Sequence, residues 1–493
     1  MPPFQKKVTK SSYVPSTASS GDDNAVDRIQ TICYFYNCKR FRIQEGGEAL
    51  KTLTNFFDQL VRKYLPDAFL FAIILTLVVF VLGMVVMGHS PVDMVQYWGE
   101  GFWELLSFSM QMSLVVVTGY VLANTPTVKK GLYKISSLAK TPGQAILLVT
   151  FVSIIACLIN YGFGLIVGAL LAVHVAKRVP TADYRVLIAG AYSAFLVWHG
   201  GFSGSIPLTI ATPGHFLEKT IGVIPVTETL FSSYNIFIVV VLLVTLPLLN
   251  WYIMKTRDPI KDYDAHIFQA ASMEPETAEE PVAKTDMYPA DKLENSRIIS
   301  LIIGLLGLAY IVYHFVTKGF DLNINIVNFI MFFLGILLHR TPRRFLDSVA
   351  DGVKNAGGII IQFPFYAGIM GMMTASGLSA ALSTWFVHIS NETTLPLLTF
   401  ISAGIVNVFV PSGGGQWAVQ GPIMIPAALQ IGADTAKTAM AIAWGDAWTN
   451  MIQPFWALPL LAIAGLKIRD IMGFCVIALF YSFIPIAIAM LFL

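Results

Sequence analysis

One carboxylate lies deep inside an apolar stretch of this sequence and is the first candidate for chemistry. It is Asp446, in the segment WGDAWTNMIQP (Trp444–Pro454). An ionisable side chain is costly to bury in a membrane span, so such a residue is a functional candidate by default. Asp446 could carry a proton or help to hold Na⁺, or it could be a hydrogen-bonded structural acid. His199, in WHGGFSGSIP (Trp198–Pro207), could line the same site or could serve only in packing.

Four segments rich in glycine and neutral polar side chains interrupt the apolar runs. Two are broken helices, expected at Trp198–Pro207 and Trp444–Pro454, and two are hairpin tips, expected at NYGFG (Asn160–Gly164) and VPSGGGQ (Val410–Gln416). Glycine allows a helix to unwind, which frees N–H groups to bind anions and carbonyl groups to bind Na⁺. The alternative is that these glycines only allow close helix packing. Four such clusters in related positions favour a binding site.

The expected ligands come from these four segments. We predict that the substrate is bound by Asn160, Gly162, Gly164, Gly200, Gly201, Ser203, Ser205, Asn407, Ser412, Gly413, Gly414, Gly415, Gln416, Thr449 and Asn450. The coupling ion is expected to be held by Asp446, Asn160, Asn407 and Ser412. This ion is expected to be Na⁺ or H⁺, and no catalytic residue, cofactor or structural metal site is expected.

The scarcity of buried charge limits the kind of substrate. No Lys or Arg lies as deep in the spans as Asp446, which indicates a small anion with a single charge. A dicarboxylate would usually require more positive potential, although bound Na⁺ could supply it. Tryptophans beside the glycine clusters could enclose a short apolar tail, or some could lie at the membrane interface instead: Trp198, Trp417, Trp444, Trp448 and Trp456.

The composition is typical of a membrane protein with many spans. Of the 493 residues, 55% are hydrophobic and only 13% are charged, whereas a soluble protein has about 25% charged residues. The mean hydropathy is +0.67. We therefore predict an all-α polytopic membrane protein whose partners are the lipid bilayer and a small-molecule anion, without nucleic acid. A homodimer is a further option that the sequence leaves open.

Apolar runs of suitable length predict about nine transmembrane helices plus two re-entrant hairpins. The helices are expected at 67–88, 101–123, 184–210, 229–252, 298–316, 325–339, 351–378, 435–464 and 471–492, and the hairpins at 143–176 and 395–431. Basic residues cluster in alternate loops, which places these loops and the N-terminus in the cytoplasm. Both ends of the first hairpin then lie inside, and both ends of the second lie outside.

The two halves of the chain resemble each other at a nearly constant offset. GEGFWELLSFSMQ (Gly99–Gln111) aligns with ADGVKNAGGIIIQ (Ala350–Gln362), and Asn160 is paired with Asn407. The orientation of the spans makes the two repeats inverted, as in many secondary transporters. We predict a disordered or non-native extension at 1–50, a first transport repeat at 51–254, a cytoplasmic linker at 255–297 and a second transport repeat at 298–493.

The glycine-rich motifs resemble those of a known family. VPSGGGQWAVQGP, AIAWGDAWTNMIQPFWALP, INYGFGLIVGAL and GGFSGSIPL are similar to motifs of the short-chain fatty acid transporter family, in the ion transporter superfamily, over roughly residues 52–493. The resemblance implies inverted repeats with two hairpins, and uptake of monocarboxylates such as butyrate or acetoacetate across the bacterial cytoplasmic (inner) membrane. His199 stands where the family often has glycine, and Asp446 where glutamate can stand.

One close alternative remains, namely a transporter of the same fold for another organic anion such as a dicarboxylate. An enzyme is disfavoured because the spans contain no HExxH, no GxSxG and no paired acids. Direct use of ATP is disfavoured because no GxxxxGK[ST] occurs. The predicted function is therefore secondary active transport, by cation symport with an elevator or alternating-access mechanism.

Overall fold

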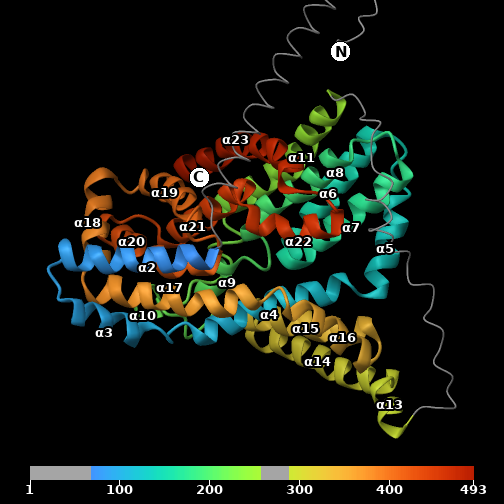
Figure 1. The fold of residues 1–493 in the computed structure, drawn as a ribbon, viewed down its shortest axis with the longest axis horizontal. Coiled ribbons are helices and arrows are strands. Elements are labelled where there is room, and N and C mark those ends of the chain that lie inside the picture. The colour runs from blue at the N-terminus through green and yellow to red at the C-terminus, as the bar shows by residue number, and fades with distance from the viewer. Residues whose placement is uncertain (1–67, 257–287) are drawn as a thin grey trace, which may run out of the picture. The chain divides into compact units, whose positions relative to one another are not determined.

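The structure is a computed structural model that describes residues 68–256 and 288–493, and within these ranges all regular structure is helical (Figure 1). The all-α fold predicted from the sequence is thereby confirmed. The extension expected at 1–50 and most of the linker expected at 255–297 lie outside the described residues. Eight helical segments in the described part are long and apolar enough to cross a membrane.

The described helices fall into two halves of the chain. The first half contains α2 (Ala68–Val85), α3 (Pro91–Gly101), α4 (Leu106–Ala123), α5 (Pro126–Ser136), α6 (Pro142–Ile159), α7 (Tyr161–Arg178), α8 (Tyr184–Ser193), the 3₁₀ helix η1 (Ala194–Gly200), α9 (Ser205–Ile210), α10 (Glu218–Ile221) and α11 (Ser233–Lys255). The second half contains α13 (Pro289–Glu294), α14 (Arg297–Lys318), α15 (Ile324–His339), α16 (Pro342–Val353), α17 (Gly357–Ala375), α18 (Leu378–Ile389), α19 (Leu395–Asn407), α20 (Gly413–Ile431), α21 (Thr435–Thr449), η3 (Asn450–Ile452), α22 (Pro454–Ala464) and α23 (Ile468–Phe492).

A serine or threonine followed by proline starts several of these helices. Ser90, Thr125, Thr141 and Thr341 each precede a proline, and each side chain accepts a hydrogen bond from a backbone N–H of the first turn. Proline is well tolerated at the first helical position, because the N–H that it lacks has no partner inside the helix. These short motifs therefore fix where α3, α5, α6 and α16 begin.

Two helices begin later than the sequence predicts. The span expected at 101–123 begins at Leu106 as α4, and the span expected at 351–378 begins at Gly357 as α17. A short helix, α3 or α16, comes before each and ends at a turn. Both short helices contain apolar residues as well as charged ones. A hydropathy average along the chain therefore extends the apolar run back across the turn, and the predicted span starts too early.

The order of the helices recurs in the second half. α3 and α4 begin at Pro91 and Leu106, whereas α16 and α17 begin at Pro342 and Gly357, in each case 251 positions later. The series α5 to α8 is matched by α18 to α21, whose first residues lie 251 to 253 positions later. The assignment of the halves as inverted transport repeats, at 51–254 and 298–493, stays a prediction.

The role of Asn160 is repeated by Ser412 rather than by Asn407. Asn160 Oδ1 accepts a hydrogen bond from Phe163 N at the start of α7, and Ser412 Oγ accepts one from Gly415 N at the start of α20. Asn407 is the last residue of α19, much as Asn160 directly follows the last residue of α6. The sequence pairing of Asn160 with Asn407 therefore matches the ends of the first arms of the two hairpins, whereas the role of Asn160 at the start of the second arm is taken by Ser412.

The helices form two packed groups (Figure 1). We call α2, α3, α4 and α14 to α17 the frame, and α6 to α9 with η1, α11 and α19 to α23 the hairpin group. In Figure 1, α2 (blue) and α17 (orange) lie side by side within the frame. The frame contacts the first hairpin through α4 and α7, and the second through α17 and α20. The two groups thus meet through equivalent helices of the two halves.

Helix length does not decide whether the first hairpin is re-entrant. Its arms, α6 and α7, have 18 residues each, which corresponds to about 27 Å. Helices of this length could enter a membrane and return, or could cross it. The re-entrant geometry expected at 143–176 and 395–431 therefore stays a prediction.

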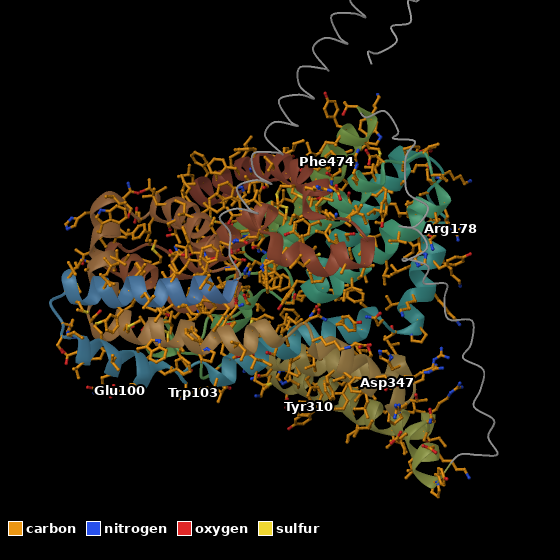
Figure 2. All side chains as sticks on the ribbon, in the orientation of Figure 1. Glu100, Trp103, Arg178, Tyr310, Asp347 and Phe474 are labelled. Atoms are coloured by element: carbon orange, nitrogen blue, oxygen red, sulfur yellow. The ribbon has the colours of Figure 1, made fainter. Side chains whose placement is uncertain are left out.

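Charged side chains gather at the margins of the fold. Figure 2 labels Glu100 on α3, Arg178 at the end of α7 and Asp347 on α16, all of them exposed and at the edge of the drawn molecule. Asp446, in contrast, is completely buried. The acid that the sequence singled out is therefore enclosed by protein.

Candidate functional site

The tip of the first hairpin is fixed to the break in the first broken helix. This helix unwinds at residues 201–204, between η1 and α9. Phe202 N donates a hydrogen bond to Leu158 O (2.7 Å), and Tyr161 N donates one to Ser203 Oγ (2.9 Å). Backbone groups that unwinding sets free are thus paired across the two segments, which holds them as one unit.

The second broken helix breaks within the segment expected at Trp444–Pro454. α21 continues regularly through Thr449, and the break comes at residues 450–453, in the second half of that segment. Gly445 lies inside α21, where a Cβ atom would approach Ala403 Cβ to 2.5 Å. This glycine therefore allows α19 and α21 to pack closely, and it does not unwind the helix.

Asn407, the last residue of α19, ties the second hairpin to this break. Its Nδ2 lies 2.9 Å from each of three oxygens, namely Asp446 O, Thr449 Oγ1 and Asn450 Oδ1. Gln453 Nε2 donates a hydrogen bond to Asn407 O at 2.8 Å. Asn407 Oδ1 is buried and has no hydrogen-bond partner among the described residues. Three oxygens from the end of α21 therefore converge on the end of the Asn407 side chain.

Asp446 meets a histidine from the other half of the chain. His199 Nε2 lies 3.2 Å from Asp446 Oδ2, and both side chains are completely buried. Asn450 Nδ2 donates a hydrogen bond to the same oxygen at 3.0 Å. His199 Nδ1 and Asp446 Oδ1 have no partner within the described part of the chain. Buried polar atoms are rarely left unpaired, so this pair retains hydrogen-bonding capacity for a ligand or an ion.

The tip of the second hairpin closes over this pair. Gly413 is the first residue of α20, and a Cβ atom at this position would lie 2.5 Å from His199 Nε2 and 2.6 Å from Ser205 Oγ. Ser205 Oγ is itself buried and has no partner among the described residues. Gly413, Ser205 and Asp446, which were all predicted site residues, thus converge on His199.

The next two glycines of this tip face the frame. A Cβ atom on Gly414 would lie 3.0 Å from the rings of Phe108 and Phe363, and one on Gly415 would lie 2.5 Å from the ring of Tyr366. Phe108 belongs to α4, and the other two aromatic residues belong to α17. The glycine tip is therefore held between His199 on one side and aromatic rings of the frame on the other.

Other predicted ligands have protein partners in this structure. Asn160 Nδ2 donates a hydrogen bond to Val115 O of α4 (3.2 Å), and Gln416 Nε2 donates one to Ala403 O (2.8 Å). The remaining glycines are in close contact with neighbouring segments: Gly162, Gly164, Gly200 and Gly201. These residues shape and anchor the tips, and a direct role for them in binding stays a prediction.

The predicted tryptophans divide into two kinds. The rings of Trp198 and Trp456 lie near Tyr161, with centroid distances of 4.7 and 5.8 Å, and both indole N–H groups are buried without a partner in the described part. Trp444 Nε1 and Trp448 Nε1, in contrast, donate hydrogen bonds to protein oxygens. Trp198 and Trp456 are therefore the tryptophans that flank the first hairpin tip beside the site.

Two further side chains support the second break and were not predicted. Tyr192 OH donates a hydrogen bond to Asn450 O at 2.6 Å. Gln453 holds Asn407 O, as described above, and its Nε2 also donates to Val408 O at 3.1 Å. Gln453 lies in the segment Trp444–Pro454 that was expected to form a broken helix, whereas no sequence signal singled out Tyr192.

The segment after α9 bridges the two helix groups. The ring of Phe216 lies 6.1 Å from that of Phe108 in the frame and 6.2 Å from that of Trp417 on α20, between centroids. Thr212 Oγ1 accepts a hydrogen bond from the backbone N of the first residue of α15 (3.1 Å). This segment therefore covers part of the junction at which the second hairpin meets the frame.

Comparisons with known proteins point to one family. The family model described as "Short chain fatty acid transporter" matches residues 49–493. A protein of Escherichia coli (strain K12) is 48% identical over 430 residues, which cover 87% of this chain and 97% of that protein. A protein of Haemophilus influenzae (strain ATCC 51907 / DSM 11121 / KW20 / Rd) is 46% identical over 440 residues, which cover 88% and 97%. Both relatives carry the name "Putative short-chain fatty acid transporter".

A solved structure shares the fold. The crystal structure of the Alcanivorax borkumensis YdaH transporter matches with a TM-score of 0.58, over 86% of this chain and 98% of that one. The two sequences are 15% identical. At this level of identity the likeness concerns the fold alone.

Proposed function

Because the chain belongs to the short-chain fatty acid transporter family, we propose that it takes up short-chain monocarboxylates, such as butyrate and acetoacetate, by symport with a cation. The observation that carries this proposal is the convergence of Gly413, Ser205 and Asp446 on His199. This arrangement offers hydrogen-bond donors to one carboxylate, and places them beside one buried acid.

The substrate carboxylate binds at the start of α20. The N–H groups of the first helical residues have no partner within a helix, and the helix dipole favours an anion there. Ser412 Oγ already accepts from Gly415 N, which leaves the N–H groups of Gly413 and Gly414 for the ligand. The unpartnered hydroxyl of Ser205, next to Gly413, supplies a further donor. A second carboxylate would find no matching cationic side chain at this tip, which favours monocarboxylates.

The acyl tail of the substrate lies toward the aromatic residues at the first hairpin tip. The ring of Trp198 lies against the ring of His199, with 3.6 Å between their centroids. The ring of Trp456 lies next to it, with its centroid 6.3 Å from that of Trp198. These rings provide apolar surface for a short chain. Their unpartnered indole N–H groups could hydrogen-bond a keto oxygen such as that of acetoacetate.

The coupling cation is Na⁺, bound at the end of Asn407. A half turn of the Asn407 amide about its Cβ–Cγ bond exchanges Nδ2 for Oδ1, which brings four oxygens together at the end of this side chain. Three of them, from Asp446, Thr449 and Asn450, lie at the C-terminal end of α21, where the helix dipole is negative. Carbonyl and side-chain oxygens at broken helices suit Na⁺ in transporters.

The carboxylate of Asp446 positions this cation site. Asn450 Nδ2 donates a hydrogen bond to Asp446 Oδ2, while Asn450 Oδ1 faces Asn407. One amide group therefore connects the buried negative charge to the oxygens that would hold Na⁺. The alternative is that the pair of Asp446 and His199 carries a proton, in which case H⁺ is the coupling ion.

Transport requires the hairpin group to move relative to the frame. The glycine tip is enclosed by His199 on one side and by the rings of Phe108, Phe363 and Tyr366 on the other. Substrate therefore reaches Gly413 only when the tip separates from its neighbours. Alternating exposure of the tip, by sliding of the hairpin group along α4 and α17, is an elevator movement.

The protein is placed in a bacterial cytoplasmic membrane with its N-terminus inside. The support for this is the positive-inside pattern, since Lys129, Lys130, Lys134 and Lys140 all lie between Ala123 and Pro142. The loop at 211–228 then faces outward. Cysteines placed in these two loops should react with a membrane-impermeant reagent from opposite sides, and the reverse pattern would overturn this orientation.

The substrate proposal is tested by uptake of labelled butyrate into proteoliposomes. Unlabelled propionate, butyrate and acetoacetate should compete, and succinate should not. Transport of succinate in the absence of any transport of monocarboxylates with two to six carbons would instead establish the dicarboxylate alternative.

A further inference from the structure

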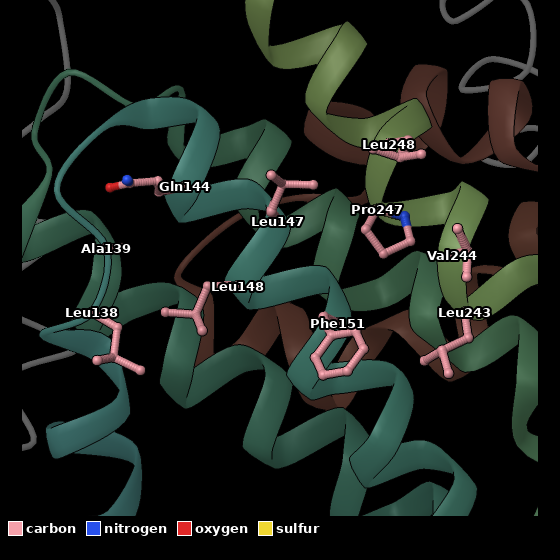
Figure 3. A pocket seen from close by; sticks show the side chains of 10 residues that line it. All are labelled: Leu138, Ala139, Gln144, Leu147, Leu148, Phe151, Leu243, Val244, Pro247 and Leu248. Carbon is pink, nitrogen blue, oxygen red and sulfur yellow. The ribbon is translucent and has the colours of Figure 1, made fainter.

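A surface groove runs between α6 and α11, which pack against each other, on the outer side of the hairpin group. Its volume is about 530 Å³, and Figure 3 shows side chains from both helices that line it, including Leu148 and Phe151 on α6 and Val244 and Leu248 on α11. Pro247 of α11 also lines the groove, and Gln144 is the single polar lining residue. Phe151, Val244 and Leu248 are exposed, so this apolar groove would face lipid in a membrane.

Two polar residues of these helices, Thr150 and Asn250, point to the other side. Asn250 Nδ2 of α11 donates hydrogen bonds to Thr150 Oγ1 of α6 (3.2 Å) and to Ser193 Oγ of α8 (3.0 Å), and all three residues are buried. The outer face is left with hydrocarbon side chains around the proline. An acyl chain is the occupant that such a groove suits, because a bilayer offers no other apolar molecule in quantity.

One end of the groove is polar and basic. Lys140 N donates a hydrogen bond to Gln144 Oε1 (3.0 Å), which places the Lys140 backbone at the Gln144 end. At the same end, Trp251 Nε1 lies 2.8 Å from the Cβ position of Gly143, and Lys255 Nζ lies 5.3 Å from the centre of the Trp251 ring. Lys140, Trp251 and Lys255 are all exposed. Tryptophan and lysine are typical of the membrane interface.

We propose that this groove is a binding site for one anionic phospholipid, with an acyl chain along Leu148 and Phe151 and the phosphate at Lys140 and Lys255. Basic pockets between transmembrane helices bind anionic head groups. The distance along α6 from Gln144 to Phe151, about 10 Å, accommodates part of an acyl chain below the head group.

A second copy of the chain is a less suitable occupant of the groove. In a two-fold dimer the same patch faces itself, so Lys140 and Lys255 of one copy would approach those of the other. Like charges in such an arrangement repel. A phosphate, in contrast, complements both lysines.

The test compares phosphatidylglycerol with phosphatidylcholine on the delipidated full-length protein in detergent, by native mass spectrometry. Wild type should retain one phosphatidylglycerol in preference to phosphatidylcholine. The double variant Lys140→Gln, Lys255→Gln should lose this preference, by about fivefold for each lysine. Lys130→Gln, which changes an exposed basic residue of the preceding helix α5, should retain it.

A second variant separates the acyl chain from the head group. Leu148→Trp fills the groove and should weaken binding of both lipids, whereas the lysine variant should still bind phosphatidylcholine as wild type does. The proposal is overturned if wild type does not distinguish the two lipids, or if the lysine variant keeps the full preference. It is also overturned if Leu148→Trp changes the oligomeric state without changing lipid binding, since this would identify a second copy as the occupant. Because both lysines are exposed, the lysine variant is expected to fold.

Discussion

His199 Nε2 and Asp446 Oδ2 lie 3.2 Å apart, although 247 positions separate the two residues in the chain. Each belongs to the broken helix of a different half, and both side chains are completely buried. A change in the charge of one therefore acts directly on the other across the boundary between the halves. This relationship links Gly413, where we propose that the substrate carboxylate binds, to Asn407, where we propose that the cation binds.

The first prediction concerns the charge of Asp446. Asp446→Asn keeps the shape of the side chain but removes its negative charge, so gradient-driven accumulation of butyrate should fall at least about tenfold. Exchange of butyrate between equilibrated sides should fall much less, because the carboxylate site itself remains. Both activities are measured in proteoliposomes and normalised to inserted protein.

Asp446→Glu is the matched control for this variant. It retains the charge and should retain part of the coupling. The resemblance of the motif to the family implies this, since glutamate can stand there at the position of Asp446. Equal loss of accumulation and exchange in Asp446→Asn, in step with the amount of folded protein, would instead indicate a purely structural acid.

The second prediction concerns the oxygen that Thr449 contributes. Thr449→Val removes Oγ1, which lies 2.9 Å from Asn407 Nδ2, while it keeps the branched shape. The Na⁺ concentration for half-maximal uptake should rise about tenfold or more, with the maximal rate largely retained. Thr449→Ser keeps the hydroxyl and should resemble wild type. An unchanged Na⁺ dependence in Thr449→Val would remove this oxygen from the cation site.

The third prediction concerns the space at Gly413. In Gly413→Ala the new methyl group would lie 2.5 Å from His199 Nε2 and 2.6 Å from Ser205 Oγ. Overpacking of this kind costs about 1–3 kcal/mol, so butyrate uptake should fall about tenfold or more. Gly131→Ala is the control, since no atom of the described residues outside the adjoining backbone of α5 lies within 4 Å of the Cβ position at Gly131. Full uptake by Gly413→Ala would show that the tip and His199 need not approach each other during transport.

The fourth prediction concerns the hydroxyl of Ser205. Ser205→Ala removes a donor that would bind the substrate carboxylate, so the KM for butyrate should rise about tenfold with little change in kcat. Ser153→Ala removes a buried, unpartnered hydroxyl of α6, which likewise has no partner among the described residues, and should leave the KM unchanged. A similar KM in both variants would exclude Ser205 from the carboxylate site.

The sequence was sufficient for the class of fold and for part of the site. Uncharged apolar runs of span length predict helices because a helix pairs its backbone N–H and C=O groups within the same segment, as the bilayer requires. Asp446 was identifiable for a related reason, since an acid is costly to bury among apolar residues in a membrane span and is therefore a functional candidate. Gly413 and Ser205 were identifiable because glycine and serine clusters interrupt helices.

The partners of these residues could not be predicted, because they depend on how distant helices pack. Nothing in the sequence around His199 indicates that it faces Asp446, nor does the sequence near Tyr192 indicate that it supports Asn450. Gly445 was taken for part of a break, although it allows α19 to approach α21. A glycine that unwinds a helix and one that admits a neighbour give the same local pattern, and only the tertiary packing separates them.

The most direct test of the account is accumulation of labelled butyrate in proteoliposomes under an imposed Na⁺ gradient, without a pH gradient. Wild type should accumulate butyrate above equilibrium, Thr449→Val should require more Na⁺, and Asp446→Asn should exchange butyrate without accumulating it. Accumulation driven only by a pH gradient would show that the coupling ion is a proton, carried by His199 and Asp446, and not Na⁺. Failure of wild type to accumulate or exchange any short-chain monocarboxylate would contradict the proposed function.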